Sequence, residues 1–405
     1  MMDKFRMLFQ ADILLKGEIN ENERTGIYFV TKNLLEQFKK DKRFEITLIF
    51  FFNPIPNDVF VRFKQNEKFK NFPTVRFYRN FEVKGISKTI INPIIKNSDY
   101  DFCFSTIGGS LPDIQLPCFG MLHDVIPFLF AEYYEKSARQ EENDFYQCSK
   151  KHLNRNTYYF CVSNSCKNDY LKFFSEQLNP NHMIVTPIAT MRSFVLQPDM
   201  GKLSNFFKRY GATKIKSNRY ILSLSTIEPR KNIPFTIRCF SEFIDKHHIT
   251  DLFFVIGGGS WDFISVTIKQ SLDYDIEKAS ATCRDKIIRL GYVADEDVEM
   301  LYSHALIFTF ISEYEGFGMP PLEAMSCGTP VITSNTSSLP EVVGDAAIII
   351  DPHDAEACIN AFENLYFNAD LREEYSKKGI SRAKMFSWEK TAKVITEKML
   401  QVYTK

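Results

Sequence analysis

Short apolar runs alternate with longer amphipathic segments through the C-terminal half of the chain. Six runs have the length and the β-branched content of buried strands: Arg219–Ser225, Leu252–Gly259, Ile287–Val293, Ala305–Ser312, Pro330–Ser334 and Ala346–Ile350. The segments between them are predicted to be helices, as in Asn232–His247. Strands that alternate with helices pair in parallel, because each helix returns the chain to the start of the next strand. We therefore predict a doubly wound parallel sheet with helices on both faces.

The N-terminal half shows a noisier version of the same alternation. Its predicted strands are Ile46–Phe52, Thr74–Arg79, Asp101–Thr106, Cys118–Asp124, Tyr158–Ser163 and Met183–Ala189. The polar stretch Met191–Lys216 is interpreted as an irregular linker. A chain of 405 residues has room for two such domains. The predicted fold class is therefore α/β, with two Rossmann-like doubly wound domains, 1–195 and 196–385, that face each other across a cleft.

The charge and the cysteines exclude some classes of function. Lys+Arg and Asp+Glu balance at 50 each, so no basic excess favours nucleic acid as a partner. Residues 51–100 are mildly basic, which fits either a solvated face or contact with an acidic lipid surface. The nine scattered cysteines favour reduced thiols in the cytoplasm. The longest apolar run, Ile46–Phe52, is far below the roughly 20 residues of a membrane span. We expect a soluble protein, at most peripheral to the inner face of a membrane.

The stretch SEYEGFGMPPLEAMSCGTPVI, Ser312–Ile332, places two carboxylates either side of a Gly/Pro-rich turn. Glu315 follows a predicted strand, and Glu323 is predicted to fall in the first turn of a helix that opens near Pro320. Three interpretations are open: a glycosidase acid/base pair, a capped helix with two incidental glutamates, and a ligand clamp whose carboxylates accept sugar hydroxyls. The first is disfavoured, because glycosidase carboxyls usually flank the substrate from opposite sides.

A second motif, SLSTIEPRKN at Ser223–Asn232, begins where a predicted strand ends. Arg230 and Lys231 are predicted to open the following helix. A guanidinium, an ammonium and the amides of a helix start would form a cradle for a diphosphate. The alternative is a solvated, basic helix start with no ligand.

Weaker signals occur at five other places. His123 follows a strand, although a lone histidine is usually structural, and Gly26 stands in a turn before a helix. Asp99–Asp101 and Asp273–Asp275 have the Asp-x-Asp form of some metal sites, but their positions favour solvated carboxylates. Gly257–Gly259 lacks Walker A or dinucleotide-binding residues, which disfavours a dehydrogenase, and is interpreted as a close backbone approach to a nucleotide. We expect no metal and no cofactor.

The run Gly291–Asp354 is similar, almost without a gap, to the retaining family-4 glycosyltransferases of the GT-B fold. Their E-x7-E segment matches Glu315 to Glu323, and their E-P-R-K-N, T-G-I and H-D-x-x-P segments match around Arg230, Gly26 and His123. The resemblance implies that Glu315 lies by the donor sugar and that Glu323 holds the ribose. It also implies that the donor faces the backbone N–H groups of Phe317, Gly318 and Met319.

The resemblance further implies that Arg230 and Lys231 bind the nucleotide diphosphate, that the Gly26 loop approaches the donor phosphates, and that His123 lies by the reaction centre. Ser225 departs from the family, which often has glycine there. The tail 386–405 resembles the family's last helix, which crosses back to the N-terminal domain.

The implied activity is metal-independent transfer of a hexosyl unit, with retention, from a GDP-, UDP- or dTDP-sugar to a hydroxyl of a glycan or a lipid-linked oligosaccharide. Transferases for bacterial surface polysaccharide, such as O-antigen, resemble the chain most, with mannosyl or rhamnosyl transfer favoured. Two other hypotheses stay open: a non-catalytic GT-B protein that only binds a sugar nucleotide, and a glycoside hydrolase or phosphorylase.

Overall fold

The structure is a computed structural model. It describes residues 4–20, 24–50, 57–76, 81–83, 86–88, 99–108, 116–130, 149–196, 199–258, 272–274 and 276–404. The basic segment 51–100 therefore lies partly outside the described residues, and Asp275 and Gly259 lie outside them entirely. The chain divides into two compact units, which are described separately. Unit 1 comprises Met1–His123, Asp144–Met191 and Ser387–Lys405, and unit 2 comprises Asp124–Asn143 and Arg192–Phe386.

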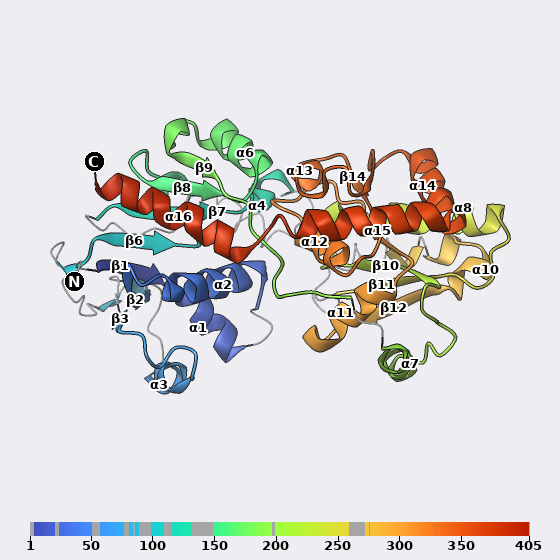
Figure 1. Ribbon diagram of the computed structural model, residues 1–405, viewed down its shortest axis with the longest axis horizontal. Coiled ribbons are helices and arrows are strands. Elements are labelled where there is room, and N and C mark those ends of the chain that lie inside the picture. The colour runs from blue at the N-terminus through green and yellow to red at the C-terminus, as the bar shows by residue number, and fades with distance from the viewer. Residues whose placement is uncertain are drawn as a thin grey trace. The chain divides into compact units, whose positions relative to one another are not determined.

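Unit 1 contains a parallel sheet of seven strands in the order β3-β2-β1-β6-β7-β8-β9 (Figure 1). The strands are β1 (Phe5–Gln10), β2 (Phe44–Phe50), β3 (Thr74–Arg76), β6 (Phe102–Ser105), β7 (Cys118–Leu122), β8 (Tyr158–Cys161) and β9 (Met183–Val185). The sequence interpretation did not single out the central strand β1. The run FRMLFQ continues almost directly into the apolar residues of α1 (Asp12–Ile19), with no Gly or Pro to separate them.

The other elements of unit 1 pack around this sheet. They are α2 (Gly26–Lys40), α3 (Asn57–Gln65), α6 (Asn164–Phe174) and α16 (Trp388–Tyr403). The strands β4 (Phe81–Val83) and β5 (Ile86–Lys88) form a separate antiparallel pair. The last helix, α16, packs against α2. Its Trp388 indole donates to the Thr190 carbonyl at 2.8 Å, and its Thr391 hydroxyl donates to the Pro187 carbonyl at 2.7 Å. These bonds fix the C-terminal helix to unit 1.

Unit 2 contains a parallel sheet of six strands in the order β12-β11-β10-β13-β14-β15. They are β10 (Tyr220–Leu224), β11 (Phe253–Gly257), β12 (Ile287–Gly291), β13 (Ile307–Phe310), β14 (Val331–Ser334) and β15 (Ile348–Ile350). Each lies within one of the six apolar runs of the C-terminal half. The prediction of two Rossmann-like sheets is confirmed. In unit 2 the strand order reverses between β10 and β13, and open α/β sheets bind ligands at such a switch point.

The helices of unit 2 cover both faces of this sheet (Figure 1). They are α7 (Met200–Arg209), α8 (Ile233–Lys246), α10 (Ala281–Arg284), α11 (Asp295–His304), α12 (Met319–Ser326), α13 (Leu339–Val343), α14 (Ala355–Phe367) and α15 (Ala369–Ala383); the short helix α4 (Ile126–Leu129) also belongs to unit 2. Helices α8 and α14 pack closely against each other. A core of isoleucine, leucine and phenylalanine side chains fills the space between them and the sheet.

Helix α7 corrects the prediction that Met191–Lys216 is irregular throughout. Asp199 caps the helix by accepting the Gly201 and Lys202 amides at 2.9 and 3.2 Å. The helix buries Leu203, Phe206 and Phe207, while its other described residues are exposed. Leu203, Phe206 and Phe207 stand at the i, i+3 and i+4 positions of an amphipathic helix, so this stretch carried a helical signal that its interpretation as a linker overlooked.

Candidate functional site

Two motif-bearing loops of unit 2 follow neighbouring strands. Strands β10 and β13 pair in parallel, with Ile221 opposite Ile307. The first loop leads from β10 into a 3₁₀ turn, Pro229–Lys231, and the second leads from β13 into α12. Because the carboxyl ends of adjacent parallel strands lie at one edge of the sheet, the two loops meet at the switch point.

The first loop departs from the predicted geometry in one respect. Arg230 and Lys231 lie in the 3₁₀ turn rather than in the first turn of the helix. Asn232 follows with a left-handed φ of 55°, its side-chain amide donates to the Pro352 carbonyl at 2.7 Å, and α8 begins at Ile233. The two cations are therefore positioned by a tight turn that Asn232 closes.

A buried ion-pair cluster joins the two loops. The Glu315 Oε1 atom accepts from Lys231 Nζ at 2.6 Å and from Arg230 Nη1 at 2.8 Å. Arg230 Nε donates to Glu228 Oε2 at 2.8 Å, and Arg230 Nη1 also donates to the Tyr314 carbonyl at 2.9 Å. Arg230, Lys231 and Glu315 are only 8%, 7% and 8% exposed. With Glu228, the cluster holds two cations and two carboxylates, so its formal charges cancel.

Burial and charge act in opposite directions on these groups. Burial alone would raise the pKa of Glu315, but Lys231 and Arg230 attract its anionic form and hold the pKa below its ordinary value. Burial lowers the pKa of Lys231, and the Glu315 carboxylate only partly offsets this effect. The Lys231 ammonium also lies over the Phe310 ring, 4.8 Å from its centroid. The Glu315 carboxylate is therefore held ionised next to Lys231, whose charged form is destabilised by burial.

Two glycines at this edge of the sheet let the backbone lie against neighbouring atoms, where a side chain would collide. Gly318 has a φ of 108°, and a Cβ there would stand 2.8 Å from Leu339 Cδ2. Gly258 has a φ of 142°, and a Cβ there would stand 1.7 Å from the Ser225 carbonyl oxygen. The backbone at Gly258 therefore lies against the Ser225 peptide, which follows β10. Other residues cannot take either position without displacing a neighbour.

Glu323 lies one turn further along its helix than the sequence predicted. Helix α12 begins at Met319, so Glu323 falls in its second turn rather than its first. Its Oε2 atom accepts from the Tyr302 hydroxyl on α11 at 3.2 Å, and its side chain is 4% exposed. Burial raises the pKa of Tyr302 well above its ordinary value, and Glu323 adds to that shift, so the phenol stays a hydrogen-bond donor. No sequence signal pointed to Tyr302.

His123 and Gly26 are both in unit 1. His123 follows β7, and its Nε2 lies 2.7 Å from the Thr106 carbonyl oxygen. Because a carbonyl only accepts, Nε2 carries the proton, and Nδ1 is the nitrogen that can act as an acceptor. The Thr106 hydroxyl lies 2.6 Å from that of Thr31 on α2, the helix that Gly26 opens. The carboxyl ends of β6 and β7 are thereby tied to the first turns of α2.

Three groups of residues that support the site were not predicted from the sequence. They are Glu228, which holds Arg230; Tyr302, which holds Glu323; and the hydroxyls of Ser337 and Ser338, which contact the Glu315 loop. Of these residues, Glu228 could have been found from the sequence, because it is the first residue of the E-P-R-K-N motif that contains Arg230.

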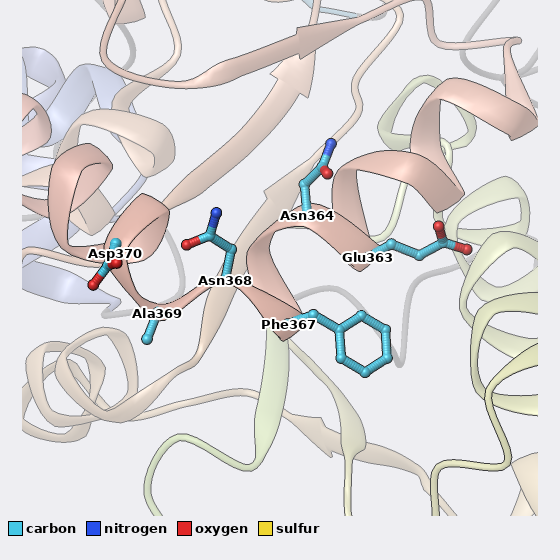
Figure 2. A pocket seen from close by; sticks show the side chains of 6 residues that line it. All are labelled: Glu363, Asn364, Phe367, Asn368, Ala369 and Asp370. Carbon is cyan, nitrogen blue, oxygen red and sulfur yellow. The ribbon is translucent and has the colours of Figure 1, made fainter.

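A surface hollow of unit 2 lies at the junction of α14 and α15 (Figure 2). It is lined by Glu363, Asn364, Phe367, Asn368, Ala369 and Asp370. The Asn368 side chain caps α15 by accepting the Leu371 amide at 3.0 Å. None of the lining residues belongs to the motif-bearing loops, and the helix junction itself accounts for the hollow.

The described residues contain no group of three or more His, Cys, Asp or Glu side chains that could hold a metal ion. Of the Asp-x-Asp residues within the described ranges, Asp101 accepts the Arg6 amide at 2.7 Å and Asp273 pairs with Arg289 at 2.6 Å. The eight cysteines in the described ranges are thiols that form no disulfide. A search of the same ranges for a helix with the length and apolarity of a membrane span found none.

Comparison with known proteins adds sequence relatives. A family model described as glycosyl transferases group 1 matches residues 207–382. O-antigen chain mannosyltransferase B of Escherichia coli is 32% identical over 269 residues, 66% of this chain and 66% of that protein. Serotype-specific mannosyltransferase WbdA of E. coli is 28% identical over 286 residues, 68% of this chain and 32% of WbdA. The chain thus spans just under two thirds of the first relative and about a third of the second.

Solved structures share the fold at low identity. Anabaena HepE in complex with UDP has a TM-score of 0.69 and 14% identity, over 98% of this chain and 100% of that one. WaaG, described as a glycosyltransferase involved in lipopolysaccharide biosynthesis, has a TM-score of 0.58 and 12% identity, over 97% and 99% of the two chains. The likeness shows that this chain has the GT-B fold.

Proposed function

The chain belongs to the group 1 glycosyl transferases of the GT-B fold, and from that premise we propose that it is a retaining hexosyltransferase dependent on a nucleotide sugar. The observation that carries the proposal is the buried contact of Glu315 with Arg230 and Lys231 at the switch point of unit 2. A cluster of this kind costs free energy to bury, so its place at the ligand edge favours a functional role.

Arg230 and Lys231 would stabilise the nucleoside diphosphate as it leaves. Arg230 donates through Nε and Nη1 to protein groups. Its Nη2 makes no hydrogen bond to the described residues, so this nitrogen can donate to a phosphate oxygen. Negative charge grows on the diphosphate as the glycosidic bond breaks, and preorganised cations lower the free energy of that transition state. This electrostatic role needs no metal ion.

The remaining site residues are proposed to place the donor. Glu315 would contact the donor sugar, and Glu323, held by Tyr302, would accept the ribose hydroxyls. Helix α12 begins at Met319, and the first amides of a helix lack intrahelical acceptors. The amides of Phe317, Gly318 and Met319 would therefore face the sugar or the phosphates. In unit 1, Gly26 and His123 are proposed to approach the donor phosphates and the reaction centre.

Retention is proposed to follow same-face attack. The acceptor hydroxyl forms the new bond to the anomeric carbon as the bond to the diphosphate oxygen breaks. The departing phosphate oxygen takes the proton of the acceptor hydroxyl. In this scheme the cations of unit 2 control the basicity of the leaving group, and no protein nucleophile is needed.

A mannosyl donor and a surface-polysaccharide acceptor are proposed from the relatives. The two sequence relatives above are named mannosyltransferases, and the first is named for the O-antigen chain. A glycan or lipid-linked oligosaccharide is the acceptor class that fits such relatives. A lipid-linked acceptor would also fit the mildly basic composition of residues 51–100 and a place at the cytoplasmic face of a membrane.

A thermal-shift panel of GDP-, UDP- and dTDP-sugars tests the donor class, because a bound ligand stabilises the folded chain by mass action. We expect GDP-mannose to give the largest shift, and acceptor-dependent release of the diphosphate to follow with the same donor. Tight binding of a donor that is never consumed would instead identify a non-catalytic sugar-nucleotide-binding protein. Glycoside cleavage without a nucleotide sugar would identify a hydrolase or phosphorylase.

A further inference from the structure

Two consecutive serines after β14 contact the loop that carries Glu315. We propose that Ser337 and Ser338 are positioning residues, which hold the Glu315 peptide in the geometry that donor transfer requires. The proposal rests on the proposed function, because it assigns the serines a role in that same site. The hydroxyls of both serines bond the backbone of the Glu315 loop, so their effect is exerted through Glu315.

Both sides of the Glu315 residue are held by these hydroxyls. The Glu315 amide donates to Ser337 Oγ at 2.8 Å. Ser338 Oγ lies 2.9 Å from the Glu315 carbonyl oxygen and 2.7 Å from the Phe317 carbonyl oxygen, and its side chain is fully buried. Fixing the amide and the carbonyl of one residue fixes the direction of its Cα–Cβ bond, and with it the path of the carboxylate.

The same turn also holds the start of the Glu315 loop. The Ser334 and Thr336 hydroxyls both donate to the Ser312 carbonyl, at 2.5 and 3.0 Å. Ser312 in turn donates through its own hydroxyl to the Arg230 carbonyl at 2.9 Å. Hydroxyls at the end of β14 and in the turn after it therefore hold the loop that follows β13. That loop is in turn bonded, through Ser312, to the turn that contains Arg230 and Lys231.

Ser337 adopts a backbone conformation that serine rarely takes. Its φ is 50°, in the left-handed region that glycine and asparagine favour. Such strain persists where the surrounding structure requires it, and it is concentrated at functional sites. A glycine would relieve the strain but could not accept the Glu315 amide. A serine at this position therefore indicates that the hydrogen bond from the Glu315 amide is needed despite the strained backbone.

A series of substitutions separates the hydroxyl from the backbone. Ser337→Gly tolerates the positive φ and removes only the acceptor, whereas Ser337→Asn tolerates the φ and keeps a side-chain oxygen. We expect Ser337→Gly to keep the thermal midpoint and the nucleoside diphosphate affinity of the wild type, while kcat falls about tenfold, the effect of one lost hydrogen bond. Ser337→Asn should recover part of the lost kcat. Full wild-type kcat in Ser337→Gly would overturn the proposal.

Ser338→Ala removes the buried donor, and Ser326→Ala is its control. Ser326 donates to the Leu322 carbonyl within α12, so its loss leaves the Glu315 loop intact. We expect kcat to fall in Ser338→Ala by about tenfold, the effect of one lost neutral hydrogen bond. In Ser326→Ala, kcat should stay within about twofold of the wild type. Equal kcat in the two variants would contradict the proposal.

Amide hydrogen exchange tests the contacts without any turnover. Exchange in a peptide covering residues 312–318 should be faster in Ser337→Gly and in Ser338→Ala than in the wild type, and unchanged in Ser326→Ala. If the wild type consumes no nucleotide sugar, the proposed function fails, and this exchange result still decides whether the serines hold the loop. Unchanged exchange in both serine variants would overturn the positioning role.

Discussion

Glu315 and Lys231 form a 2.6 Å ion pair in the interior of unit 2, although 84 residues separate them in the chain. Both side chains are nearly buried, and the Arg230 guanidinium shares the same carboxylate oxygen. In the ligand-free protein this carboxylate is paired with the same two cations that are proposed to bind the diphosphate. Donor binding is therefore expected to be a competition between the phosphates and Glu315 for Arg230 and Lys231.

Glu315→Gln should separate binding from turnover. Loss of the carboxylate releases Lys231 and leaves Arg230 paired with Glu228 alone, so the nucleoside diphosphate should bind more tightly, while kcat falls by roughly 10²–10³ because a transition-state contact is lost. The free variant should also be less stable by about 3–5 kcal/mol, since the buried cations lose their partner. Titration calorimetry, initial rates and urea unfolding measure these three effects. Weaker diphosphate binding in the variant would contradict the competition.

Lys231→Met should weaken diphosphate binding and lower kcat/KM by about 10²–10³, because it removes a preorganised cation from the leaving group. Arg289→Met is the matched control, since Arg289 is a partly exposed cation of β12 that pairs with Asp273. Initial rates over a range of donor concentrations give kcat/KM for both variants. Similar losses in the two variants would show a general effect of charge rather than a cradle.

His304 should make the stability of the folded chain pH-dependent. It is 4% exposed, its Nδ1 lies 3.0 Å from the Ser217 hydroxyl, and its Nε2 has no hydrogen-bond partner among the described residues. Burial lowers the pKa of His304 below its unfolded value of about 6.5, so the folded state favours the neutral ring. Its contribution to stability is therefore complete above pH ~6.5 and is lost as the pH falls below that value.

The thermal midpoint between pH 7.5 and 5.5 measures this effect. We expect the midpoint of the wild type to drop more over this range than that of His304→Gln, which cannot titrate. His353→Gln removes an exposed histidine and should behave like the wild type. An identical pH dependence in all three proteins would count against the assignment to His304.

Gly258→Ala should damage the donor edge of unit 2. A Cβ at this position would collide with the Ser225 carbonyl oxygen, so the peptide that leads from β10 toward Arg230 must move. Gly211→Ala is the control, because Gly211 also has a positive φ, of 67°, but has no atom within 4 Å of the added Cβ. Thermal unfolding should show a loss of about 1 kcal/mol for the control and a larger loss for Gly258→Ala. Equal losses would refute the steric argument.

Local sequence patterns predicted much of unit 2. All six strands of its sheet lie within the apolar runs, because strands covered on both faces carry continuous apolar residues. The meeting of Arg230 with Glu315 follows from the same pattern. Their motifs come after β10 and β13, and these strands are neighbours where the strand order reverses.

Other features depend on contacts that no local pattern encodes. Strand β1 merges in sequence with α1, with no Gly or Pro between them. The partner of Glu323 was missed because Tyr302 lies on another helix, 21 residues away. The serines that hold Glu315 were missed because their hydroxyl bonds depend on the geometry of two loops, one of which contains a strained φ.

The stereochemistry of turnover tests the central claim most directly. Proton NMR of the wild type with the donor selected by the thermal-shift panel, and a glycan acceptor, follows the anomeric signals of donor and product. We predict that the donor signal decays, that free nucleoside diphosphate appears, and that the product has the anomeric configuration of the donor. A product of inverted configuration, or a bound donor that is never consumed, would contradict the account.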